Sequence, residues 1–278
     1  MNWILAIAAL TVVGYLLDRE IYFYEGAHLG PRLQAWLYDR WSKNYDRGKR
    51  LSQLRDDEML AQPLLATLQA AGVPEPFILD FATGTGRLSQ ALLSCLDPHG
   101  HIIALDLSRG MLEQAAAKLA SSPGRARVEL LRHTSLPLPF PDATFDVVCA
   151  LEVLELFPGM EEPLRELGRV LRPGGILLTS RGTEESGRRA KIKSKNAFTS
   201  LLSAQGFEQI EITPWWKLFD RVFAVRHGES DPVGRRTLSA VMRCPGCKQT
   251  RWQQGRGMWT CSGCGQRLPL TRDGIVLG

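Results

Sequence analysis

The chain has 278 residues, of which 44% are hydrophobic and 23% charged, and its formal net charge is +5 at pH 7. This length can hold one substantial domain and a smaller unit, and the absence of internal repeats and low-complexity tracts excludes repeat architectures. Residues 181–278 contain 17 of the 34 Lys and Arg residues but only 8 of the 29 Asp and Glu residues. This basic end either binds something acidic or keeps the chain soluble.

The amino-terminal segment is an uncharged apolar run. Residues Trp3–Leu17 are apolar on every face of a helix, unlike a solvent-exposed helix with one apolar stripe. A helix of this length covers about 22 Å, against about 30 Å for the hydrocarbon core of a bilayer. The run also lacks the basic start of an export signal. We therefore expect residues 1–24 to be a retained membrane anchor, with the following Lys and Arg residues holding the rest of the chain on the cytoplasmic side.

The next segment has apolar and aromatic residues at helical spacing. Leu33, Trp36, Leu37 and Trp41 recur with this period, and Tyr38 and Tyr45 lie nearby. A helix with such a face either lies on a membrane surface or covers a pocket as a lid.

Residues 78–86, Ile-Leu-Asp-Phe-Ala-Thr-Gly-Thr-Gly, predict a strand that ends in a glycine turn. The small residues let the backbone approach a ligand, and a helix expected from Arg87 to Leu96 directs its free N–H groups to the same place. Asp106 ends a second predicted strand and can accept both hydroxyls of a ribose. The pattern predicts a nucleotide-type cofactor.

Two classes of cofactor use this geometry. A dinucleotide fingerprint requires G-x-G-x-x-G, but Ser89 stands where the third glycine belongs. The carboxylate of Asp80 would repel a pyrophosphate, whereas S-adenosylmethionine has no phosphate and carries a cationic amine. The residues therefore favour S-adenosylmethionine.

Regularly spaced apolar runs predict an α/β fold with a parallel sheet and its ligand at the carboxyl ends of the strands. Pro173-Gly174-Gly175 is expected to end a helix from Glu162 to Leu171 and to start a strand at Ile176. A helix at 196–205 and strands at 208–213 and 215–225 would complete the sheet with an antiparallel pair. The apolar runs lie at 77–79, 102–105, 128–131, 146–151 and 176–179.

Several segments together resemble the class I S-adenosylmethionine-dependent methyltransferases, especially the type 11 branch that includes enzymes of ubiquinone and menaquinone biosynthesis. The resemblance runs from about Tyr38 to about Arg226 and implies a Rossmann-like sheet with helices on both faces. It is carried by residues 78–89, 103–108, Met111-Leu112, 138–148 and 169–178.

The resemblance implies roles for individual residues. Leu107 and Met111 would line the adenine, although Met111 is equally well an ordinary core residue. Related sequences commonly carry an aspartate for the adenine amine where this chain has His133-Thr134-Ser135, so either a backbone carbonyl or the side chain of His133 or Thr134 substitutes. The region of residues 33–45 caps the cofactor in those enzymes, which favours a lid. Asp106 would bind the ribose, and the methionine moiety would be surrounded by Asp80, Ala82, Thr83, Gly84, Thr85 and Gly86.

The residues after the fourth strand identify no catalytic base. Transfer from a sulfonium mainly requires alignment of the nucleophile. Residues 151–158 lack the Asn-Pro-Pro-Tyr loop of amino-group methyltransferases and resemble the Glu-x-x-Glu-His stretch of quinone-pathway O-methyltransferases, with Leu156 in place of the histidine. Glu152 and Glu155 either keep two of three metal ligands or flank a helix.

Two C-x-x-C pairs near the carboxyl terminus predict a closed, structural zinc site made by Cys244, Cys247, Cys261 and Cys264. A disulfide framework is the alternative, but an S-adenosylmethionine enzyme belongs in the reducing cytosol. Residues 241–278 resemble the small zinc-ribbon proteins that activate some RNA and protein methyltransferases. Such a ribbon, fused through a linker at 227–240, would either brace the catalytic domain or orient substrate.

The sequence thus predicts an anchor (1–24), a methyltransferase domain (25–226), a linker and a zinc ribbon. We expect methylation of a hydrophobic small molecule, such as a quinone precursor or a lipid, at the membrane; no required protein partner is indicated. RNA or protein methylation guided by the ribbon, and a non-catalytic S-adenosylmethionine-binding protein, are the alternatives. RNA is the second choice of partner, suggested by the ribbon and the basic carboxyl end. A basic cluster after the fifth predicted sheet strand either meets phosphate on a lipid or RNA or forms a solvated loop: Arg181, Arg188, Arg189, Lys191, Lys193 and Lys195.

Overall fold

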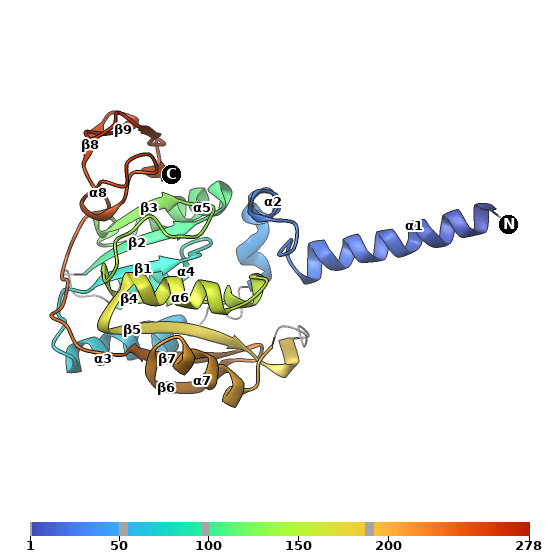
Figure 1. Cartoon of the computed structure of the whole chain (residues 1–278), viewed down its shortest axis with the longest axis horizontal. Helices are drawn as coiled ribbons and strands as arrows, with labels where there is room; N and C mark the ends of the chain where they lie inside the picture. The colour runs from blue at the N-terminus through green and yellow to red at the C-terminus, as the bar shows by residue number, and fades with distance from the viewer. Residues whose placement is uncertain (1, 50–54, 96–99, 187–191) are drawn as a thin grey trace.

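The structure is a computed structural model that describes residues 2–49, 55–95, 100–186 and 192–278. These residues form a central eight-stranded sheet in the order β11-β3-β2-β1-β4-β5-β7-β6 (Figure 1). β7 is antiparallel to both β5 and β6, and the other neighbours are parallel, so the predicted parallel sheet with an antiparallel pair is confirmed. The strands are β1 (Phe77–Phe81), β2 (His101–Asp106), β3 (Val128–Arg132), β4 (Phe145–Ala150), β5 (Leu171–Gly182), β6 (Phe207–Trp216), β7 (Phe219–Arg226) and β11 (Ile275–Leu277).

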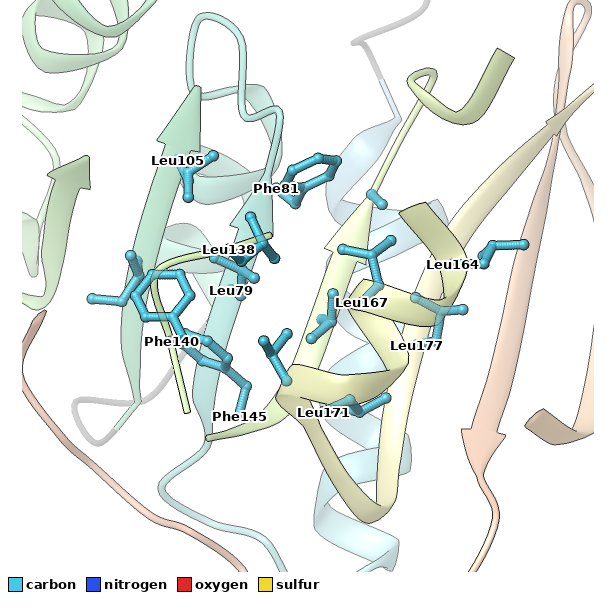
Figure 2. Packing of buried hydrophobic residues seen from close by; sticks show 14 of the residues in the cluster. Leu79, Phe81, Leu105, Leu138, Phe140, Phe145, Leu164, Leu167, Leu171 and Leu177 are labelled. Atoms are coloured by element: carbon cyan, nitrogen blue, oxygen red, sulfur yellow. The ribbon is translucent and has the colours of Figure 1, made fainter. Parts of the chain in front are cut away.

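Helices cover both faces of the sheet. Successive residues of each strand point to opposite faces, so neighbouring residues contribute to different apolar clusters. In β1, Leu79 belongs to one apolar cluster and Ile78 to the other. The first cluster includes side chains of α6 (Glu161–Val170) and α7 (Lys195–Ala204), and Figure 2 shows part of this packing. The second includes side chains of α3 (Gln62–Ala70), α4 (Arg87–Cys95) and α5 (Arg109–Leu119). The predicted layers are confirmed.

The start of β5 differs from the prediction. The helix α6 ends at Val170, and the strand begins at once with Leu171 rather than at Ile176. Phe145 of β4 pairs with Leu171 and Val147 pairs with Ile176, so Pro173-Gly174-Gly175 lies in a bulge inside the strand. The positive φ of Gly174, 72°, is the conformation that allows this extra loop of backbone.

The apolar run forms α1 (Asn2–Asp18), which extends away from the sheet (Figure 1). Its large apolar side chains are exposed, for example Leu10 at 71%. In the described part of the chain, no helix is both long and apolar enough to cross a membrane. α1 has 17 residues and covers about 25 Å, against about 30 Å for a hydrocarbon core. This finding contradicts the predicted membrane anchor, and the orientation inferred from the anchor loses its basis.

The predicted helix at 33–45 is present as part of α2 (Pro31–Lys49), which packs across the beginning of α5. Gly110 allows this close approach, since a Cβ atom there would lie 3.0 Å from Asp39 Cα. The chain then passes through a π-helical turn, Asp57–Ala61, into α3. Because α5 begins just after β2, its contact with α2 places α2 beside the carboxyl end of β2.

The carboxyl-terminal region is joined to the main sheet. After the short helix α8 (Leu238–Val241), the strands β8 (Trp252–Gly255), β9 (Met258–Cys261) and β10 (Arg267–Pro269) form a small antiparallel sheet. The strand that follows the small sheet in the chain, β11, belongs to the central sheet and pairs in parallel with β3. The last strand of the predicted ribbon thus forms one edge of the central sheet.

Candidate functional site

A pocket lies at the carboxyl ends of β1, β2 and β4, where the topology of a parallel sheet places a ligand. Its walls come from the glycine turn, the end of β2, residues 133–138, residues 151–157 and one face of α2. Gly86 lies behind the turn instead, where a Cβ atom would be 3.0 Å from Ala115 Cβ. The structure brings the other predicted residues together in the lining: Asp80, Ala82, Thr83, Gly84, Thr85, Asp106, Leu107, Met111, His133 and Thr134.

The glycine turn exposes its backbone to the pocket. Ala82, Gly84 and Gly86 have positive φ values of 55°, 56° and 76°. The turn is held by a hydrogen bond from Thr83 N to Leu105 O (3.0 Å). A Cβ atom built on Gly84 would meet nothing within 4 Å, so the space in front of this residue is open. A ligand can approach the main chain there without meeting a side chain.

Asp106 links the end of β2 to the turn. Its Oδ2 accepts the N–H of Gly84 and its Oδ1 accepts the N–H of Ser108, both at 2.8 Å. Burial raises the pKa of Asp106 to about 6, and the two backbone N–H donors oppose this rise. Each carboxylate oxygen can accept more than one hydrogen bond, so Asp106 can also bind a pair of vicinal hydroxyls.

Asp80 supports the turn from behind. Its Oδ2 accepts hydrogen bonds from Thr83 Oγ1 (2.6 Å) and Ser89 Oγ (2.7 Å). Burial raises the pKa of this carboxyl, because it disfavours the charged form. When ionised, the carboxylate would attract a cationic group in the adjoining pocket. The serine that replaces the third glycine of a dinucleotide fingerprint is thus a hydrogen-bond donor to Asp80.

His133 and Thr134 line the side of the pocket that follows β3. The backbone N–H of His133 donates to Asp106 O (3.0 Å), and its ring Nε2 lies 3.3 Å from Pro137 O. Burial lowers the pKa of His133, which favours the neutral ring. This wall is completed by the apolar side chains of Leu136 and Leu138.

Two carboxylates of α2, which the sequence analysis did not single out, bind the pocket elements. Asp46 Oδ1 accepts from Thr85 Oγ1 (2.6 Å), and Asp46 Oδ2 lies 2.7 Å from Lys118 Nζ. Asp39 Oδ1 accepts from Ser108 Oγ (2.6 Å). Residues seven apart lie on one face of a helix, and this spacing was the available indication in the sequence. The two contacts hold α2 as a lid beside the glycine turn.

Arg87 was also missed as a site residue. It lines the pocket, donates from Nη2 to Asp56 Oδ1 (2.7 Å) and from Nη1 to Glu152 Oε1 (2.9 Å), and lies over the ring of Trp215. Glu155, by contrast, accepts the N–H of Gly182 at 2.8 Å. Within the described ranges, the glutamates of residues 151–158 belong to no group of potential metal ligands.

The four cysteines of the two C-x-x-C pairs form a group of potential metal ligands, since their Sγ atoms all lie within 4.8 Å of one another. The Sγ atoms of Cys244 and Cys264 are 3.6 Å apart, and those of Cys247 and Cys261 are 3.5 Å apart. A tetrahedron with zinc–sulfur bonds of about 2.3 Å has sulfur–sulfur edges of about 3.8 Å. The donor set therefore fits a tetrathiolate metal site.

Comparison with known proteins agrees with this geometry. Residues 78–175 match the family model described as a methyltransferase domain. Residues 78–175 are thus similar to a methyltransferase domain, and the sheet topology agrees with the Rossmann-like sheet that the sequence resemblance implies.

Curated methyltransferases are similar to about half of this chain. The chain is 34% identical over 139 residues to the demethylmenaquinone methyltransferase of Symbiobacterium thermophilum, covering 50% of this chain and 55% of that one. It is 35% identical over 113 residues to the ubiquinone/menaquinone biosynthesis C-methyltransferase UbiE of Ectopseudomonas mendocina, covering 40% and 44%. The chain thus spans about half the length of the curated relatives it matches.

A solved structure shares the fold. It is that of a putative S-adenosyl-L-methionine-dependent methyltransferase from Methanococcus maripaludis, with a TM-score of 0.55 and 19% identity. The match covers 69% of this chain and 94% of that chain.

Proposed function

We propose that this protein is an S-adenosylmethionine-dependent methyltransferase that methylates a hydrophobic small molecule of the quinone-precursor type. The observation that carries the proposal is the hydrogen bond from Gly84 N to Asp106 Oδ2 at the carboxyl edge of the sheet. This bond places a carboxylate that can accept ribose hydroxyls beside an exposed glycine backbone, in a segment that matches a methyltransferase domain.

The pocket residues fit this cofactor. Asp106 would accept the ribose hydroxyls, and Leu107 and Met111 would contact the adenine, with His133 and Thr134 at its edge. The buried carboxylate of Asp80 and the turn at residues 82–85 would surround the methionine moiety, whose amine is cationic. When bound, S-adenosylmethionine supplies an activated methyl group. The protein's own task is then to hold the acceptor in line and to keep water away.

The remaining wall suits an apolar acceptor with a ring. Tyr38 and Tyr45 of the lid face the same pocket as Phe81 and Phe157. Phe81 and Phe157 are stacked with their ring centroids 6.3 Å apart. Aromatic walls of this kind bury flat apolar molecules, while Arg87 and Glu152 offer one polar edge for a hydroxyl or carbonyl group. The quinone-pathway relatives support the same class of substrate.

We further propose that the four cysteines bind one structural zinc ion. Each pair lies on a tight turn that is closed by a backbone hydrogen bond, from Lys248 N to Cys244 O and from Gly265 N to Cys261 O, both 2.9 Å. Four thiolates would complete the coordination and leave no position for a substrate.

The basic cluster gives little support to RNA as the substrate. Arg181 is 3% exposed and donates to Asp220 from Nη2 at 2.7 Å and from Nε at 3.0 Å. Lys195 Nζ also lies 3.8 Å from Asp220, and Lys193 Nζ lies 4.0 Å from Glu161. These charges are thus partly used within the fold. The other members, Arg188, Arg189 and Lys191, lie outside the described residues.

The test is to incubate the purified full-length protein with methyl-tritiated S-adenosylmethionine and a total cell extract, and then to count the label in organic-soluble, RNA and protein fractions. The proposal expects label in the organic-soluble fraction, and expects the variant Asp106→Asn to reduce it. Label in RNA or protein would replace the small-molecule substrate by a macromolecule. Absence of label from every fraction, with S-adenosylmethionine still bound, would favour a non-catalytic binding protein.

A further inference from the structure

One wall of the pocket is shared with the carboxyl-terminal region. β11 pairs in parallel with β3, with Ile275 opposite Leu130 and Leu277 opposite Arg132. The pairing continues past the strand, where Gly278 N donates to Arg132 O (3.0 Å). His133, which follows Arg132 in the chain, lines the pocket. The end of β3 is therefore held in place by the last residues of the chain.

The segment after His133 is fixed from the same side. Arg243 N donates to Pro139 O (2.7 Å), in a loop whose Leu136 and Leu138 line the pocket. Leu138 also belongs to the apolar cluster that contains Trp259 and Leu268 of the small sheet. Trp259 is 3% exposed, so its ring is an integral part of this core.

The cysteines are adjacent to these contacts in the chain. Cys244 directly follows Arg243, and Cys261 ends the strand that carries Trp259. Trp252 of the neighbouring strand donates from Nε1 to Met242 O (2.7 Å), next to Arg243. A metal ion that closes the four thiolates would thus fix both points at which the small sheet holds the pocket wall. Without the ion, a unit of this size keeps few restraints of its own.

We propose that the zinc ribbon is a positioning element for the adenine side of the cofactor pocket, so that zinc occupancy and cofactor affinity are coupled. The inference rests on the proposed function and on the proposed zinc site. Coupling between two sites is reciprocal: zinc tightens the binding of cofactor, and cofactor tightens the binding of zinc by the same free energy.

The first experiment measures the binding of S-adenosylhomocysteine by calorimetry to the full-length protein, loaded with zinc, stripped by a chelator, and reloaded. We expect stripping to weaken binding by at least about tenfold and reloading to restore it. We also expect S-adenosylhomocysteine to slow the release of zinc to a colorimetric chelator. Equal affinity with and without zinc would overturn the inference. Failure of the zinc-loaded protein to bind at all would instead contradict the proposed function.

A pair of variants tests the contact without touching the cysteines. Arg243→Pro removes the N–H that bonds Pro139, while Arg243→Ala keeps it. The dihedrals of Met242, φ −71° and ψ 121°, are those that a residue before proline adopts. We expect Arg243→Pro to bind S-adenosylhomocysteine more weakly than Arg243→Ala. Equal binding by the two variants would contradict the proposed route.

Hydrogen exchange keeps the inference testable where a variant loses its zinc. On removal of zinc from the wild-type protein, we expect faster exchange at residues 128–140, next to the ribbon, and unchanged exchange in β6 and β7 at the opposite edge of the sheet. An increase confined to residues 244–270, or an equal increase at both edges, would overturn it. This readout needs no activity and no bound cofactor.

Discussion

Asp106 and Gly84 are joined by a hydrogen bond of 2.8 Å that connects the end of β2 to the glycine turn after β1. One carboxylate thus sets the shape of the turn and offers its remaining lone pairs to the pocket. Asparagine keeps the size of this side chain but has one acceptor oxygen in place of two, so Asp106→Asn loses one of the two backbone hydrogen bonds as well as the negative charge.

We expect Asp106→Asn to weaken the binding of S-adenosylhomocysteine by roughly ten- to a hundredfold, since hydrogen bonds to a charged group contribute about 1.5–3 kcal/mol. Calorimetric titration measures the change. Asp142→Asn is the matched control, because Asp142 is a largely exposed partner of Arg169 outside the pocket. An unchanged affinity in Asp106→Asn would show that this carboxylate does not bind the ligand.

The pH dependence of binding follows from the same group. Burial raises the pKa of Asp106 from 3.8 to about 6 in the free protein. Hydroxyl donors bind the ionised carboxylate, so affinity should be full above this pKa and fall as the pH decreases through about 6. Its contribution to folding has the opposite sign: it is present below 3.8 and lost as the pH rises through about 6. Titrations on both sides of this value should show the fall in affinity, and Asp106→Asn should remove most of it.

Gly84→Ala and Gly206→Ala separate backbone strain from the filling of the pocket. Both glycines have positive φ values, 56° and 83°, and a Cβ atom would meet nothing within 4 Å at either. Each substitution should therefore cost about 1–2 kcal/mol of unfolding free energy, measured in urea. Only Gly84 lines the pocket, so only Gly84→Ala should also weaken the binding of S-adenosylhomocysteine. A similar loss of binding in Gly206→Ala would make strain the cause.

Asp146→Ala should be strongly destabilising. The fully buried carboxylate of Asp146 accepts from Phe77 N (3.0 Å), Val233 N (2.8 Å) and Arg172 Nε (2.7 Å). Removal would leave the buried guanidinium of Arg172 unpaired, which costs about 3–5 kcal/mol. Urea unfolding should show this loss, and the exposed Asp142→Ala should lose less than about 1 kcal/mol. Equal effects of the two substitutions would contradict the role of Asp146 in joining Phe77, Arg172 and Val233.

Cys261→Ser should abolish stoichiometric zinc, because a closed tetrathiolate site loses one of its four ligands. Cys95→Ser is the control, since Cys95 lies in α4, away from the four-cysteine group. Metal analysis of the purified proteins should find about one zinc ion in the control, and little in Cys261→Ser. Retention of a full zinc ion by Cys261→Ser would exclude the proposed ligand set.

The sequence predicted best those features of the structure that depend on residues close together in the chain. The glycine turn, Asp106 and the alternation of buried strands are local patterns, and the structure has each of them. The contact of Arg87 with Asp56 joins residues 31 apart, and that of Asp39 with Ser108 joins residues 69 apart. Such pairs have no local pattern, so they could not be predicted without the topology.

Length and edge position explain two further differences. α1 was predicted as an anchor from its uniform apolarity, but no helix among the described residues is both long and apolar enough to cross a membrane. β11 has three residues and gave no strand pattern, yet it extends the central sheet. The predicted separation of ribbon and catalytic domain therefore missed the strand that joins them.

The most direct test of the central claim is a calorimetric titration of the zinc-loaded full-length protein with S-adenosylhomocysteine, with NADH as the competing ligand. If the pocket is an S-adenosylmethionine site, one molecule binds per chain, NADH does not displace it, and Asp106→Asn weakens it. Absence of binding, or displacement by NADH, would contradict the assignment of this pocket and, with it, the proposed methyl transfer.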